Sequence, residues 1–113
     1  MREFLASVVG GSPTDVPKLY DLLSPINHVG SHCPPTLLFL SMDDDVIPNQ
    51  PVRLLKQNLK GAGVPVVLIE YPHTVHGFDL ILSRYSPPAQ SALFHLDRFL
   101  ALINQSDVPA LKQ

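Results

Sequence analysis

The chain has 113 residues, of which 45% are hydrophobic and 16% charged, and its formal net charge is −2. This length and composition favour a single folded domain over a disordered segment. The weak acidity and the lack of a lysine or arginine cluster argue against a nucleic-acid partner. No apolar run approaches the roughly 20 residues that a membrane-spanning helix requires.

Cysteine usage and the first residues bear on the compartment. Cys33 is the one cysteine in the sequence, so no intrachain disulfide can form. Small secreted domains usually need such cross-links, and residues 1–5 lack the basic and long apolar regions of a signal peptide. We therefore expect a cytoplasmic protein, unless its true N-terminus is missing.

Two short helices are predicted in the first part of the chain. Apolar residues fall at helical spacing in residues 4–9, and the glycine pair that follows ends this run. A Ser-Pro-Thr-Asp sequence that begins at Ser12 then has the pattern of a helix start, and this second helix is expected to reach about Leu23. Residues 26–35 are expected to form an irregular loop.

The middle of the chain predicts a parallel βαβ unit. Residues 36–40 form a short, continuously apolar run, which is typical of a strand buried on both faces of a parallel sheet, and residues 64–71 form a second apolar run rich in β-branched residues. An amphipathic helix is expected between them, from about residue 49 to Gly61. Since two strands cannot bury both of their faces, we expect further strands, either from a larger sheet or from another chain.

The last part of the chain predicts two further helices. Residues 78–85 are apolar enough for a short helix, and Ser86 precedes a proline pair that starts the final helix. Residues 105–113 are expected to form a frayed tail. The buried face of the final helix is expected to consist of six residues: Ala92, Leu93, Leu96, Phe99, Leu100 and Ile103.

Candidate chemistry lies just after the two predicted strands. Asp44 is the middle of three consecutive acidic residues that follow the first strand, and His76 follows the second. The carboxyl ends of adjacent parallel strands lie at one edge of a sheet. A buried carboxylate that accepts the imidazole Nδ1–H fixes the tautomer that can take a proton from a nucleophile. We therefore predict that Asp44 and His76 form such a pair, with Asp45 as the alternative acid.

Polar residues of the chain offer two other candidate sites, a metal site and a nucleophilic serine. His73, His76 and Asp79 could bind a metal ion, but their spacing is weak support and no fourth ligand is evident. The sequence contains no G-x-S-x-G elbow that would carry a nucleophilic serine. Cap, turn or strand-end roles explain four serines: Ser12, Ser24, Ser41 and Ser86.

The segment from Pro34 to Asp79 resembles the C-terminal part of the α/β-hydrolase fold. The resemblance is greatest to the esterase, lipase and dienelactone-hydrolase-like branch, which borders on the prolyl-oligopeptidase-type peptidases. That family carries its acid in a P-P-x-L-h-h-h-G-x-x-D-x-x-V-P-like segment and its histidine in a G-x-G-H-G-F-like segment. These positions correspond to Asp44 and His76, while Ser41 stands where the family usually has glycine.

The resemblance implies that residues 1–113 are a partial α/β-hydrolase domain, with the nucleophile and the oxyanion hole upstream. It further implies a serine hydrolase acting on a small ester or amide, in which His76 is the general base and Asp44 orients it. No metal or organic cofactor is implied, and the 113 residues alone are expected to be inactive. One alternative is a non-catalytic hydrolase remnant that binds a partner through an exposed strand edge. Another is part of a prolyl-oligopeptidase-like peptidase.

Overall fold

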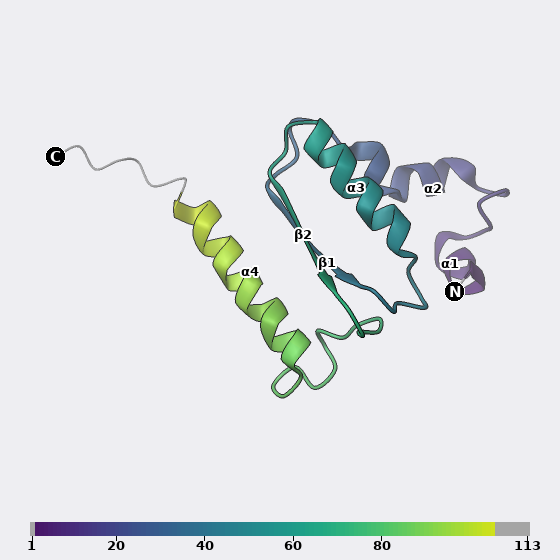
Figure 1. Cartoon of the computed structure of the whole chain (residues 1–113). Helices are drawn as coiled ribbons and strands as arrows, with labels where there is room; N and C mark the ends of the chain where they lie inside the picture. The colour runs from purple at the N-terminus through teal and green to yellow at the C-terminus, as the bar shows by residue number, and fades with distance from the viewer. Residues whose placement is uncertain (1, 106–113) are drawn as a thin grey trace.

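The predicted βαβ unit forms the centre of the molecule. The computed structural model describes residues 2–105. In it, β1 (Thr36–Ser41) and β2 (Val66–Tyr71) pair in parallel, and α3 (Asn49–Gly61) connects them (Figure 1). This arrangement, an α/β fold with a parallel sheet, confirms the predicted architecture.

The remaining helices lie on both sides of this unit. Figure 1 shows α4 on the side of the strands opposite α3, whereas the N-terminal helices lie on the same side as α3. No helix in residues 2–105 combines the length and apolarity needed to cross a membrane. The elements outside the βαβ unit are α1 (Arg2–Val9), α2 (Pro17–Leu23), the 3₁₀ helix η1 (Pro25–His28) and α4 (Pro87–Gln105).

The start of β2 lies two residues later than the apolar run predicts. The Val64 amide donates to the Leu59 carbonyl oxygen at 3.0 Å and so satisfies the C-terminal end of α3. Pro65 has no amide proton to give to a strand, although its carbonyl oxygen accepts from Thr36 at 2.9 Å. The ladder therefore begins at Val66.

An aromatic cluster joins the sheet to α4 and to the loop after β2. Tyr71 contacts Phe39 edge to face, with ring centroids 5.9 Å apart, and it contacts Phe78 at 4.8 Å. Ala92 of α4 is buried against this cluster. The Tyr71 hydroxyl also lies 3.2 Å from the Ser91 hydroxyl of α4. These contacts fix the loop that follows β2 relative to the strands.

The other face of the sheet packs against α3. Successive residues of a strand point to opposite faces. Leu40 therefore points away from the aromatic cluster, and it is buried, as is Leu59 of α3. The Nε of Arg53 on α3 lies 2.7 Å from a carboxylate oxygen of Glu70 on β2, which marks the same face.

The second helix begins at Pro17, so the predicted start at Ser12 is wrong. The expected bonds between Ser12 and Asp15 do form, with the Ser12 amide 3.0 Å and its hydroxyl 2.6 Å from Asp15 Oδ2, but they close a turn. Val16 has φ −130° and ψ 55°, outside the helical region. A residue that precedes proline is pushed out of that region, so Pro17 rather than Pro13 occupies the first helical position.

Residues 78–85 form turns, so the short helix predicted there is wrong. Gly77 and Leu82 both have positive φ, at 71° and 49°. A left-handed residue interrupts a right-handed helix, and the chain closes separate turns instead, such as the Tyr85 amide to the Leu82 carbonyl oxygen at 2.8 Å.

The predicted buried face of α4 is only partly correct. Ala92 is buried as expected, and Ala89 is buried as well. Leu93, Leu96 and Leu100 are exposed, because the two-stranded sheet is too narrow to cover the whole apolar surface of a long helix. Residues 106–113, most of the expected tail, lie outside the described residues.

The aromatic cluster provides a test of this fold. We expect Phe78→Ala to lower the free energy of unfolding by about 3 kcal/mol, because it removes a buried ring and leaves a cavity beside Tyr71. Phe94→Ala, at an exposed position on α4, should change it by less than about 0.5 kcal/mol. Urea unfolding measures both, and equal losses would contradict the assigned core.

Candidate active site

The structure brings Asp44 and His76 into direct contact at the carboxyl edge of the sheet. His76 Nδ1 lies 2.9 Å from Asp44 Oδ2. Since an ionised carboxylate can only accept, Nδ1 is the donor, and in the neutral ring Nε2 is then left as an acceptor. The side chain of Asp44 is 10% exposed and that of His76 is 51% exposed. The pair therefore has a buried acid and a ring accessible from outside.

The carboxylate of Asp44 is held by its own loop. Its Oδ1 accepts hydrogen bonds from the amides of Val46 and Ile47, both at 2.8 Å, which leaves Oδ2 for His76. Burial of Asp44 raises its pKa, but the bonds from the Ile47 amide, the His76 ring and the Val46 amide together hold the pKa below its ordinary value. Asp44 is therefore ionised at neutral pH.

The neighbouring acids do not share this environment. Asp45 is exposed, so the structure places Asp44, not the alternative Asp45, against the imidazole. Asp43 points to His73 instead, with 3.8 Å between Asp43 Oδ2 and His73 Nδ1, and both side chains are largely exposed. His73 and His76 thus meet different carboxylates.

The metal site considered from the sequence does not form. No group of three or more His, Cys, Asp or Glu side chains in residues 2–105 is arranged to hold an ion. Of the three residues considered, His76 is paired with Asp44 and His73 lies beside Asp43.

A hollow of about 260 Å³ adjoins the pair. Asp44 and His76 contribute to its wall, and the apolar side chains of Ile47, Val52 and Phe78 form much of the remainder. Gly77 has φ 71° and open space where a Cβ would lie, so the backbone conformation rather than crowding calls for glycine beside His76. The hollow could hold a small group next to the imidazole.

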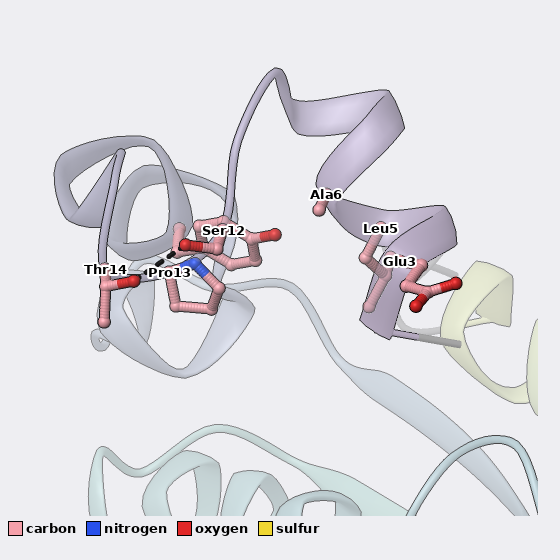
Figure 2. Close-up of a pocket in the computed structure, with 7 residues that line it drawn as sticks. Glu3, Leu5, Ala6, Ser12, Pro13 and Thr14 are labelled. Atoms are coloured by element: carbon pink, nitrogen blue, oxygen red, sulfur yellow. Dashed lines mark hydrogen bonds between the residues drawn. The ribbon is translucent and has the colours of Figure 1, made fainter.

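A larger hollow of about 520 Å³ lies between α1 and the turn before α2, and it contains Ser12. Figure 2 shows the Ser12 hydroxyl bonded to Thr14, across from Leu5 and Ala6 of α1. The two hydroxyl oxygens lie 2.7 Å apart, and because the Ser12 hydroxyl donates its one proton to Asp15, Thr14 is the donor to Ser12. No histidine lines this hollow, so it lacks the base that a nucleophilic serine would need.

Comparisons with known proteins agree with the fold. The model of the prolyl oligopeptidase family matches residues 4–94. The propionate-bound structure of a thermophilic esterase from the planctomycete Thermogutta terrifontis superposes with a TM-score of 0.69 at 27% sequence identity, covering 99% of this chain and 38% of the esterase. A structure of the same esterase, esterase 2, phosphorylated by paraoxon has a TM-score of 0.65 at 28% identity, and the match covers 70% of this chain and 30% of that one. No curated protein matches the chain significantly.

The pKa of Asp44 predicts how stability responds to acid. A lowered folded-state pKa contributes stability that is present above the ordinary value of 3.8 and lost as the pH falls through the folded pKa. We therefore expect Asp44→Asn to be less stable than the unsubstituted protein at pH 6, with the difference shrinking below pH 3.8. Urea unfolding across this pH range measures it.

Asp45→Asn is the matched control, since Asp45 is an exposed acid in the same loop. Its stability should follow that of the unsubstituted protein at every pH. A difference for Asp44→Asn that does not depend on pH would show that the carboxylate gains nothing from its hydrogen bonds.

Proposed function

The chain belongs to the prolyl oligopeptidase family, which has the α/β-hydrolase fold, and on that basis we propose that Asp44 and His76 are the acid and base of a serine hydrolase that cleaves carboxylic esters. The observation that carries the proposal is the 2.9 Å contact between His76 Nδ1 and a buried carboxylate. An exposed loop histidine without a role would not need such a partner.

The proposed mechanism assigns each group one task. His76 Nε2 takes the proton of the serine hydroxyl as that oxygen attacks the ester carbonyl, and it later gives the proton to the leaving alcohol. Asp44 accepts the Nδ1–H throughout, which holds the ring in place and stabilises the imidazolium while it carries the extra proton. Because the pKa of Asp44 is lowered, the carboxylate keeps its charge during both transfers.

We place the nucleophile and the oxyanion hole outside these 113 residues. The sequence holds no G-x-S-x-G elbow. The Ser12 hydroxyl donates to Asp15 within a turn, and Ser12 lines a different hollow from His76. The chain spans 38% of the length of the Thermogutta esterase, which supports the same division. The residues described here would then supply the proton-transfer half of the active site.

Short-chain esters are the proposed substrates. Structures of the similar esterase hold propionate and butyrate. The hollow beside His76, at about 260 Å³ with apolar walls, is of a size that suits such small groups. Peptide hydrolysis is the alternative within this family, and an assay with ester and amide substrates of the same acyl group separates the two.

A test of the proposed function removes the base. In the protein that also contains the serine elbow, we expect His76→Gln to lower kcat for p-nitrophenyl butyrate by more than about a thousandfold, since no group remains to accept the serine proton. His73→Gln, in the same loop but beside Asp43, should leave kcat nearly unchanged. Equal activity of the two variants would contradict the role of His76.

The position of the nucleophile is tested by labelling. Paraoxon phosphorylates the Thermogutta esterase, so it is a suitable reagent. The adduct should lie on a serine outside these 113 residues. An adduct found by mass spectrometry on any serine of this chain would show that the nucleophile has been placed wrongly.

A second candidate function is that of a non-catalytic binding module, and exposed apolar residues support it. Leu93, Leu96 and Leu100 of α4 and Val67 of β2 are all exposed, as a surface that meets a partner would be. This candidate predicts that His76→Gln leaves any esterase activity of the protein unaffected, so the same assay decides between the two.

A further inference from the structure

Two hydroxyl-bearing residues are buried between the loops that carry Asp44 and His76. Ser41 ends β1 and is 7% exposed, and Thr74 lies in the loop after β2 and is 5% exposed. A buried hydroxyl is costly unless it is hydrogen-bonded, so its partners are informative.

The contacts of these hydroxyls join the end of β1 to the loop after β2 and brace that loop against the end of β2. Ser41 Oγ donates to the Thr74 carbonyl oxygen at 2.5 Å. The Thr74 hydroxyl, with one proton to give, lies 2.7 Å from the Tyr71 carbonyl oxygen and 3.1 Å from Ser41 Oγ. We refer to these two residues as the Ser41–Thr74 pair.

The Thr74 carbonyl oxygen also accepts a hydrogen bond from the backbone of the loop after β1. The Asp43 amide donates to the Thr74 carbonyl oxygen at 3.0 Å, in addition to the Ser41 hydroxyl. Asp43 immediately precedes Asp44, and Thr74 lies two residues before His76. One oxygen atom therefore holds the start of the loop after β1, which carries Asp44, against the loop after β2, which carries His76.

His76 itself is exposed, but the residues two positions before and after it in the sequence are buried. Thr74 precedes it, and Phe78 follows it, with its ring packed against Tyr71 at a centroid distance of 4.8 Å. The segment between these two anchors is short, so the position of Thr74 limits where the imidazole can lie. A shift of Thr74 would be passed to His76 Nδ1, because few free dihedral angles separate them.

We propose that the Ser41–Thr74 pair positions the Asp44–His76 hydrogen bond, by holding the two loops at the separation at which Nδ1 meets Oδ2 before any substrate binds. Neither hydroxyl touches the reacting groups, so both are positioning residues. Their effect on catalysis rests on the function proposed above, whereas their effect on the geometry of the pair does not.

The test is proton exchange at His76 Nδ1 in the intact protein, followed by nuclear magnetic resonance. The Nδ1 proton of a histidine bonded to a carboxylate is strongly deshielded, and its loss in Asp44→Asn assigns it. We expect Ser41→Ala and Thr74→Val to speed its exchange with solvent by about tenfold. Ser41→Ala removes a buried hydrogen bond between the loops, and Thr74→Val removes the hydroxyl that lies between the Tyr71 carbonyl oxygen and Ser41 Oγ. Thr74→Ser, which keeps the hydroxyl, should retain slow exchange.

Thr36→Val is the matched control. Thr36 starts the same strand, and its hydroxyl donates to the Pro34 carbonyl oxygen at 2.9 Å, far from the pair along β1. Loss of the Thr36 hydroxyl should leave the exchange of the His76 Nδ1 proton unchanged. The amide signals of α3 report whether each variant is folded. Ser41→Ala is expected to fold, because the Thr74 carbonyl still accepts from Asp43.

The remaining outcomes would overturn the proposal. Unchanged exchange in folded Ser41→Ala and Thr74→Val would mean that the loops hold their separation without the hydroxyls. Equal acceleration in Thr36→Val, or loss of the fold in both test variants, would assign the pair to stability alone. If the unsubstituted protein shows no Nδ1 proton signal that depends on Asp44, then the Asp44–His76 hydrogen bond itself is absent and the proposed function is contradicted too. If that signal is present but the Ser41 and Thr74 variants do not change its exchange, only the role of the Ser41–Thr74 pair is contradicted.

Discussion

The site depends on the parallel pairing of two strands that end level with each other. Ser41 pairs with Tyr71 at the last position of the ladder, so the loops after both strands leave the sheet at the same edge. Asp44 and His76, separated by 32 positions in sequence, meet there at 2.9 Å. A shift of register would move one loop along the sheet and reverse the faces of its strand, which would separate the two side chains.

The Asp44 carboxylate and the His76 imidazole differ in how far each is buried. The Asp44 carboxylate is almost enclosed and has a partner for each oxygen, so it is fixed and charged. The imidazole donates one hydrogen bond from Nδ1–H, and about half of its side chain is exposed, so Nε2 can meet a group from outside. This asymmetry, a fixed acid and an accessible imidazole, supports the proposed proton relay.

The sequence predicts the contact between Asp44 and His76 better than it predicts the elements at the edges of the chain. Continuous apolar runs identify the buried strands, and the residues after them give Asp44 and His76. The start of α2 depends on the effect of Pro17 on Val16, which competes with a good cap pattern at Ser12. The turns after Gly77 depend on a left-handed Leu82, for which leucine gives no sequence signal. Thr74 is likewise unmarked, because its importance arises from burial between two loops distant in sequence.

In the proposed enzyme, His76 is a base held ready for a serine that lies outside these residues. A crystal structure of the protein that includes the serine elbow would give the distance between His76 Nε2 and the serine Oγ. We expect about 3 Å, with His76 Nδ1 still bonded to Asp44. An Nε2 that points away from every serine, or a His76 that has left Asp44, would contradict it.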